Sequence, residues 1–378
     1  MLVSPRRYET AVWRCGQVEC EDVIRAVDDV ELLAPGLLAR RENVVTRKAQ
    51  RAARRLLHLD LDFVPQPEPV KLERDYDILF FYAQNLEDLI ALESVAGWRE
   101  RCAKKVCLIE ELWVEDLRLW GDHGLHRLEG FDFVGVGFRD SARVLGEMTG
   151  LRCAWVPGAI DAVRFYPGAR PVARSIDIFG MGRRSEFTHQ ALLDLVEREG
   201  WTYLFDTVEP RRVLEGHHEP HRAQLAAMIR RSRYFIANKA RMGATDIGDQ
   251  EELGFRSYEG AAAGAVLLGE APKSVSAQLL FDWPDAHVEV PFGATDAMVD
   301  AIRALEADPE RVARIRRDNV VHCLRRHDWA YRWQTILRGI DVEPREQLGQ
   351  RIRLLHGLAD GYGSDRETAQ VARAARAI

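Results

Sequence analysis

The stretch DQEELGFRSYEGAAAGAVLL, residues 249–268, carries two carboxylates eight positions apart, Glu251 and Glu259. Gly254 lies between them and allows the chain to turn. The pattern predicts a loop that bears Glu251 and then a helix that begins near Phe255. Glu259 would lie about one turn inside that helix.

The apolar run at residues 265–268 follows small residues at 260–264 and is typical of a buried strand. A helix that begins after Gly254 presents backbone N–H groups, which attract anions. The neighbouring carboxylates accept hydrogen bonds from hydroxyl groups. The stretch therefore suits a ligand with phosphate at one end and a sugar at the other.

This pattern resembles the nucleotide-sugar site of GT-B fold glycosyltransferases, whose large retaining family has an E-x7-E motif. RSYE at residues 256–259, followed by small residues, is more similar to the spore-maturation-type glycosyltransferase-like subgroup. A second segment, VPGAID at 156–161, resembles the motif that closes the amino-terminal domain in these proteins, with Gly158 and Ala159 where asparagine and glycine are usual. The resemblance covers about residues 75 to 337.

Apolar runs that alternate with helical segments predict strands of parallel sheets. They lie at residues 77–82, 105–109, 131–136, 152–156, 176–179, 201–205 and 234–237, and a helix is expected at residues 86–98. Together with the resemblance they predict an α/β protein of two Rossmann-like domains that face each other across a cleft. The expected parts are an acceptor-side domain at 1–170, a donor-side domain at 171–335 and a helical tail at 336–378.

The resemblance implies a transferase of the hexosyltransferase type that moves a sugar from a nucleotide-diphosphate sugar to an acceptor hydroxyl. Glu259 would bind the ribose, Glu251 the transferred sugar, and Arg184 the diphosphate. The family's lysine five residues after this arginine is His189 here, so Lys239, Arg241 or Arg256 is expected to supply the second cation. The full expected donor set is Gly182, Arg183, Arg184, Lys239, Leu253, Gly254, Phe255, Arg256 and Glu259.

Glu110 and Glu111 end the strand expected at 105–109 and stand where many relatives have histidine and aspartate. Either could accept the proton of the acceptor hydroxyl, or serve as a structural acid at a strand end. With Glu251 they form the expected catalytic set. Cations and helix dipoles at the diphosphate imply transfer without a metal or cofactor, and the E-x7-E relatives imply retention of anomeric configuration.

A net charge of −6 argues against nucleic acid as a partner. No apolar run reaches the length of a membrane span and no signal peptide is present, so a cytoplasmic location is expected. Six cysteines without a C-x-x-C pair predict buried reduced thiols. The basic segment 40–55 is either a solvated helix or a contact with anionic membrane or acceptor.

Several other interpretations stay open. Gly180 and Gly182, with Asp206 further on, match part of a dinucleotide-binding fingerprint, although Ser185 replaces its third glycine and E-x7-E is left unexplained. The cluster HHEPH at 217–221 contains metal-ligand residues, but Pro220 favours a polar loop. A non-catalytic nucleotide- or glycan-binding protein, or a sugar-nucleotide epimerase, would share the same fold.

Overall fold

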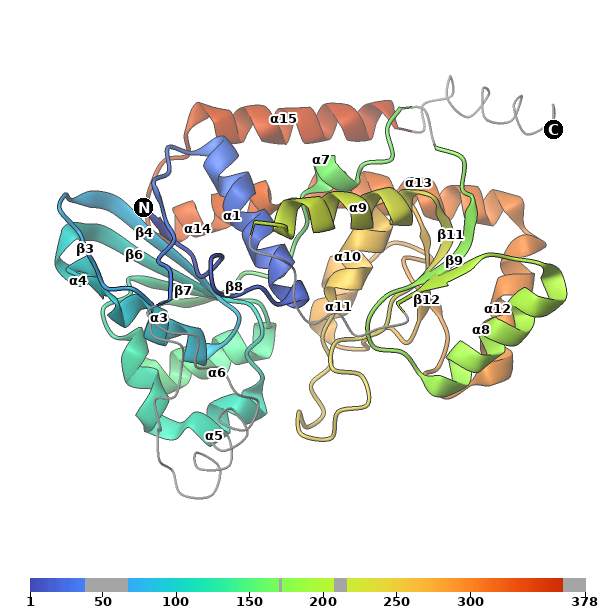
Figure 1. Cartoon of the computed structure of the whole chain (residues 1–378), viewed down its shortest axis with the longest axis horizontal. Helices are drawn as coiled ribbons and strands as arrows, with labels where there is room; N and C mark the ends of the chain where they lie inside the picture. Colours follow the sequence, from blue (N-terminus) through green and yellow to red (C-terminus); the bar gives the residue numbers. More distant parts are fainter. Residues whose placement is uncertain (38–66, 170–171, 207–215, 363–378) are drawn as a thin grey trace.

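Figure 1 shows the computed structural model of the chain, which describes residues 1–37, 67–169, 172–206 and 216–362. Two parallel sheets lie side by side, each with helices on both faces (Figure 1). The expected class, α/β with two Rossmann-like domains, is confirmed. The basic segment 40–55 and the end of the expected tail, from residue 363, lie outside the described residues.

The first sheet has the strand order β2-β1-β4-β6-β7-β8, and all its pairings are parallel. Its strands are β1 (Leu2–Val3), β2 (Leu32–Leu33), β4 (Tyr76–Ala83), β6 (Cys102–Ile109), β7 (Phe133–Val136) and β8 (Cys153–Trp155). Along β4, Leu79 and Phe81 enter one core while Phe80 and Tyr82 enter the other. Successive side chains point to opposite faces, so an uninterrupted apolar strand needs cover on both sides.

The helices of the first domain are α1 (Cys15–Val27), α3 (Ile90–Glu93), α4 (Trp98–Arg101), α5 (Val114–Leu125) and α6 (Arg139–Thr149). The prediction of a single helix at residues 86–98 is wrong. The chain forms a short 3-10 helix, η2 (Leu86–Leu89), then α3, and then β5 (Val95–Ala96), which pairs with β3 (Val70–Lys71). Gly97, at φ 87°, makes the left-handed turn into α4 that other residues rarely adopt.

The second sheet has the order β10-β9-β11-β12-β13 and is also entirely parallel. Its strands are β9 (Ile176–Gly180), β10 (Tyr203–Phe205), β11 (Ser232–Ile236), β12 (Val266–Gly269) and β13 (Val288–Glu289). Its helices are α8 (Glu186–Glu199), α9 (His218–Arg230), α10 (Phe255–Ala262), α11 (Val275–Leu280), α12 (Thr295–Glu306) and α13 (Pro309–Arg326), with α7 (Ala162–Phe165) leading in from the first domain.

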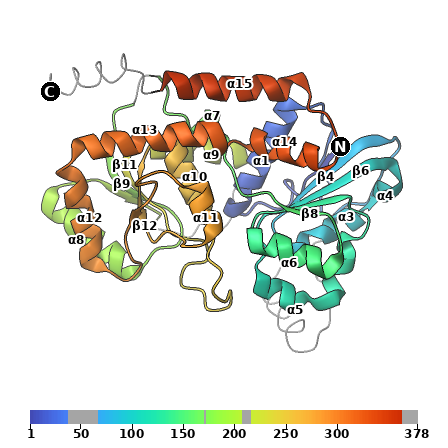
Figure 2. The ribbon, with the colours of Figure 1, turned by 180° about the vertical axis from the view of Figure 1, so that it is seen from behind.

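The chain returns to the first domain after α13. Trp329 and Trp333 of α14 (Trp329–Gly339) are buried in the same core as Phe80 and Tyr82 of β4. The following helix, α15 (Glu346–Gly361), runs along both domains and packs on α13, α1 and α14 (Figures 1 and 2). The described part of the expected tail thus contributes to both domains.

The cysteines and the apolar content of the helices can be compared with the expectations from the sequence. All six cysteines are free, and only Cys153 is partly exposed. Within the described ranges no helix is long and apolar enough to cross a membrane.

Candidate functional site

Two adjoining cavities of about 280 and 830 Å³ lie between the domains. The first domain contributes Gln84, Glu110, Glu111, Gly137 and Phe138, each just after a strand of its sheet. The second contributes Met181, Gly182, Arg183, Asp206 and Asn238, likewise after strands. The carboxyl ends of parallel strands are where open α/β sheets bind ligands, so this cleft is the candidate site.

The motif stretch folds as expected at its helix. Helix α10 begins at Phe255, and its N-cap residue Gly254 provides no side-chain cap. A Cβ atom at Gly254 would lie 3.3 Å from the carbonyl oxygen of Asn238, so the glycine admits a close backbone approach. Leu253, Gly254, Phe255 and Arg256 all line the cleft. The start of α10 therefore faces the space between the domains.

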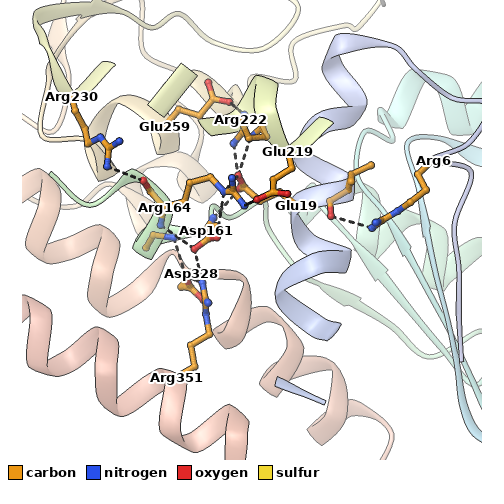
Figure 3. A network of polar contacts seen from close by, with 12 residues as sticks. Arg6, Glu19, Asp161, Arg164, Glu219, Arg222, Arg230, Glu259, Asp328 and Arg351 are labelled. Carbon is orange, nitrogen blue, oxygen red and sulfur yellow. Dashed lines mark hydrogen bonds and ion pairs between the residues drawn. The ribbon is translucent and has the colours of Figure 1, made fainter. Parts of the chain in front are cut away.

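Glu259 lines the smaller cavity but is only 1% exposed. Its two carboxylate oxygens accept hydrogen bonds from Arg222 and Arg256. Figure 3 shows Glu259 beside Arg222. Burial alone would raise the pKa of Glu259, but the Arg256 and Arg222 guanidiniums outweigh it and lower that pKa to about 2. The carboxylate is ionised, and each oxygen keeps lone-pair capacity for a further donor.

Arg222 connects Glu259 to the other domain. Its Nε atom lies 2.8 Å from Oε2 of Glu19 on α1, and the side chain is 4% exposed. Glu19 Oε1 also accepts a 2.8 Å hydrogen bond from the backbone N–H of Asp161, which leads into α7. Figure 3 shows this network, in which side chains of α1, α9 and α10 meet. Sequence reasoning missed Arg222, because only the fold brings it to Glu259.

Glu251 lines neither cavity. Lys239 Nζ lies 2.5 Å from its Oε1, and the backbone N–H of Lys273 donates to its Oε2 at 2.7 Å. The neighbouring Glu252 lines the smaller cavity instead, where it accepts hydrogen bonds from Gln250 and Ser276. Burial raises the pKa of Glu252 to about 7. The acid that lines the cavity is thus the residue next to the one that the E-x7-E spacing selects.

The loop after β9 combines a glycine with two arginines. Gly182 has φ 88°, and its N–H lies 3.1 Å from Oδ1 of Asp206. Arg184 is held by the same carboxylate, with Nη1 2.6 Å from Oδ1. Asp206, the acid of the alternative dinucleotide fingerprint, is thus bound within the protein. Arg183 lines both cavities and makes no ion pair with any described carboxylate, only a 3.4 Å hydrogen bond to the Met242 carbonyl.

The other three expected cations are already paired. Lys239 lies between Glu251 and Glu270, Arg241 pairs with Asp246 at 2.8 Å, and Arg256 pairs with Glu259. All three line at least one of the cavities. Among the expected cations, Arg183 is therefore the one least neutralised by carboxylates of the protein and the best placed to pair with a ligand.

Glu110 and Glu111 lie together on the opposite wall. Gln84 Nε2 donates to both, at 3.3 and 3.1 Å, and the indole N–H of Trp113 donates to Glu111 at 3.1 Å. Burial, and then the neighbouring Glu111 carboxylate, raises the pKa of Glu110 to about 8. Two adjacent acids thus differ in environment, which separates acid from base roles in many active sites.

The long polar segment 238–254 connects β11 to α10 and contacts the first domain between these two elements. Ile247 is buried against Trp113 and Phe138, which belong to the first domain. Gln250 accepts a 2.9 Å hydrogen bond from the backbone N–H of Val114 and donates to Ser141. We call residues 238–254 the strap, because they tie the two walls of the cleft together.

The histidine cluster does not form the polar loop that the sequence suggested. His217 is the N-cap of α9, and His218 to His221 form its first turn. Pro220 is tolerated there because the first N–H groups of a helix have no intrahelical acceptor. Across the described ranges, no group of three or more His, Cys, Asp or Glu side chains is placed to hold a metal ion.

Comparison with known protein families gives a match over the second domain. Residues 153–338 match the family described as glycosyl transferase-like. The matched residues contain the loop after β9, the strap and α10. No curated protein sequence matches the chain.

Comparison with solved structures gives matches that extend over both domains. Sucrose-phosphate synthase from Thermosynechococcus elongatus is similar with a TM-score of 0.50 and 12% identity, over 90% of this chain and 97% of that one. A trehalose-phosphate synthase from Burkholderia xenovorans has a TM-score of 0.47 and 12% identity, over 89% and 85% of the two chains. A glycosyltransferase from Rickettsia africae gives 0.48 and 11%, over 89% and 96%. The first of these supports the GT-B arrangement of the two domains.

Proposed function

We propose that this protein is a glycosyltransferase that moves a sugar from a nucleotide-diphosphate sugar to an acceptor hydroxyl, in the cytoplasm and without a metal ion or cofactor. One observation carries the proposal. The interdomain cleft has a basic wall around the start of α10 and an acidic wall at Glu110 and Glu111. A diphosphate leaving group suits the first wall, and removal of a proton from an attacking hydroxyl suits the second.

On the basic wall, Arg183 binds the diphosphate together with the first N–H groups of α10. A hydrogen bond to a charged group contributes about 1.5–3 kcal/mol, against about 0.3–1 kcal/mol for a helix terminus at an exposed site. Arg183 therefore dominates, and its contribution grows as the leaving group gains charge in the transition state. Arg184 acts less directly because Asp206 already holds it.

The carboxylates of the second domain bind hydroxyl groups. Glu259 binds the ribose through the lone pairs that Arg222 and Arg256 leave free. Glu252, which lines the cavity, is better placed than Glu251 for the hydroxyls of the transferred sugar. Glu251 then holds Lys239 beside the diphosphate.

On the acidic wall Glu111 is the general base. Glu110, whose pKa is raised to about 8, is largely protonated at neutral pH and cannot accept another proton. The likeness to E-x7-E relatives favours retention of anomeric configuration, which requires the hydroxyl to attack the same face of the transferred sugar that the diphosphate leaves.

A second candidate function follows from the burial of Glu259. A carboxylate that is 1% exposed and bound by two arginines also suits a protein that binds nucleotide or glycan without catalysing transfer. Donor hydrolysis separates the two functions, because only the enzyme releases nucleoside diphosphate from a sugar donor. Conversion of the donor to an epimer without release would identify an epimerase.

The test begins with a thermal-shift screen of nucleoside diphosphates and their sugars. A ligand at 100 times its dissociation constant stabilises the folded state by about 2.7 kcal/mol. Calorimetry with the best nucleoside diphosphate then compares wild type with Arg183→Ala, which we expect to bind roughly ten- to a hundredfold more weakly. Arg338→Ala, at an exposed arginine that lines neither cavity, is the control. Equal affinity in all three proteins would remove Arg183 from the site.

A further inference from the structure

Trp13 is a large apolar side chain left in solvent at the mouth of the cleft. It belongs to the 3-10 helix η1 (Val12–Arg14), between β1 and α1, and is 53% exposed. It lines both cavities. The other large apolar side chains that are exposed in the described residues line neither of them. This position therefore distinguishes Trp13 from ordinary surface apolar residues.

The segment that carries Trp13 is fixed on both sides. Arg14 Nη2 lies 2.8 Å from Oδ1 of Asp88, in the first domain. Two residues further on, a Cβ atom at Gly16 would lie 3.2 Å from the Phe255 ring, so α1 packs directly on the start of α10. The exposed indole thus stands on an anchored turn. Aromatic surfaces held in this way bind flat ligand faces with little loss of side-chain entropy.

The polar groups of the first-domain wall that line the smaller cavity together with Trp13 are Gln84, Glu110 and Glu111. They offer an amide and two carboxyl groups, which bind hydroxyls well. The nearby Arg14 pairs with Asp88 and Glu9, and its positive charge offsets only part of the charge of this wall. A negatively charged acceptor would be repelled here and drawn to Arg183 across the cleft.

We propose that Trp13 and this acidic wall form the acceptor subsite, and that the acceptor presents an uncharged sugar ring. The C–H face of the ring stacks on the indole, and its hydroxyls reach Gln84 and the two glutamates. The attacking hydroxyl loses its proton to Glu111 as it takes the sugar from the donor, and the nucleoside diphosphate leaves. This proposal rests on the proposed function and adds the acceptor class to it.

The experiment compares wild type, Trp13→Phe, Trp13→Ala and the control Leu354→Ala, an exposed apolar residue on α15. Calorimetry gives the affinity for the best nucleoside diphosphate. Turnover of its sugar donor is measured with neutral methyl glycosides of glucose, galactose, mannose and N-acetylglucosamine, and with glucuronic acid, glucose 6-phosphate and glucosamine. Saturation-transfer NMR measures binding of the same methyl glycosides without donor.

We expect a neutral glycoside to accelerate donor turnover most. Trp13→Ala should raise the KM for that glycoside about tenfold and leave nucleoside diphosphate affinity within about twofold. Trp13→Phe, which keeps a ring, should lie between Trp13→Ala and wild type. Leu354→Ala should behave as wild type.

Three results would overturn the subsite. The first is weaker nucleotide binding in Trp13→Ala with an unchanged KM, which would place the base on the indole. The second is a preference for charged acceptors. The third is the absence of saturation transfer to any methyl glycoside in wild type. A wild-type protein that binds methyl glycosides through Trp13 but turns over no donor would instead refute the proposed transferase and leave a glycan-binding site.

Discussion

Carboxylates of the same cleft differ because of what surrounds each of them. Glu259 lies between two guanidiniums, which lower its pKa to about 2, whereas burial and an adjacent acid raise the pKa of Glu110 to about 8. One is a fixed negative charge at neutral pH and the other is mostly neutral. Side-chain type alone therefore does not set the role of an acid here.

Glu110 should make stability depend on pH. The folded protein keeps a proton on Glu110 up to about pH 8, while the ordinary value is 4.5. Its stabilising contribution is therefore full below pH 4.5 and is lost as the pH rises towards 8. We expect Glu110→Gln to lose less Tm than wild type between pH 5 and 9, measured by calorimetry. Glu129→Gln, at an exposed site, is the control, and parallel curves for all three proteins would contradict the prediction.

Glu259 should be important for stability as well as binding. Glu259→Gln leaves Arg256 and one side of Arg222 without their charged partner in a buried site. Removal of one member of a buried pair costs about 3–5 kcal/mol. Urea denaturation should show a loss of this size, against less than about 0.5 kcal/mol for the exposed Glu219→Gln. An equal effect of both changes would mean that the buried network is not stabilising.

Glu111→Gln tests the general base. Loss of a general base typically lowers turnover by about 10²–10⁴-fold. We expect kcat to fall by that order in Glu111→Gln while donor affinity, measured by calorimetry, stays near that of wild type. Glu111 should be removed from the mechanism if turnover is unchanged.

At the scale of elements, the strap links the two walls of the cleft. It contacts the first domain through the apolar side chain of Ile247, the hydrogen bonds of Gln250, and Arg241, which pairs with Asp116 and lies over the Trp113 ring. A segment held by so few contacts opens more easily than a core strand. Under the proposed function, we expect donor entry and product release to depend on the strap more than on either sheet.

Ile247→Ala should loosen the strap selectively. The change removes most of the side chain that packs on Trp113 and Phe138. Hydrogen exchange followed by mass spectrometry should then show faster exchange in peptides from residues 238–254, with β9 and β12 unchanged. The control is Ile302→Ala in the core of α12, which should destabilise the second domain without singling out the strap. Uniform faster exchange in Ile247→Ala would contradict the idea of a separate strap.

At the scale of the whole molecule, the two domains share their last helices. Trp329, Trp333 and Ile336 of α14 complete a core that they share with strands and α1 of the first domain and with Leu348 of α15. The first sheet would expose the apolar side of β4 and β6 without them. The first domain is therefore completed only after α13, when the chain returns to it with α14.

A fragment of residues 1–170 should fail to fold on its own. It exposes Phe80, Tyr82, Val106 and Leu108, which α1 covers only in part. We expect no cooperative thermal transition for this fragment by circular dichroism. Fusion of residues 327–361 to it through a flexible linker should restore a transition. A cooperative transition in the unfused fragment would show that α14 is dispensable for the first domain.

The sequence by itself determined the two-sheet architecture, the start of α10 and the general position of the cleft. Apolar strand runs, glycines at turns and the acidic pair are local signals, and each specifies its own element. The apolar run at residues 105–109 also identified Glu110 and Glu111 as acids at the end of a strand. The prediction of a helix at 86–98 was wrong because Val95 pairs with Val70 in a two-stranded sheet. This contact is non-local, and it outweighs the local helix propensity of the segment.

Tertiary structure alone decided which charges are free and which are paired. Arg222 reaches Glu259 across 37 positions of sequence, and Glu19 reaches Arg222 across 203. Glu252 rather than Glu251 faces the cavity, and Trp13 stands at its mouth because η1 is anchored to Asp88 and α1 packs on Phe255. Electrostatic and packing partners are set by distance in space, and no local pattern of residues encodes that distance.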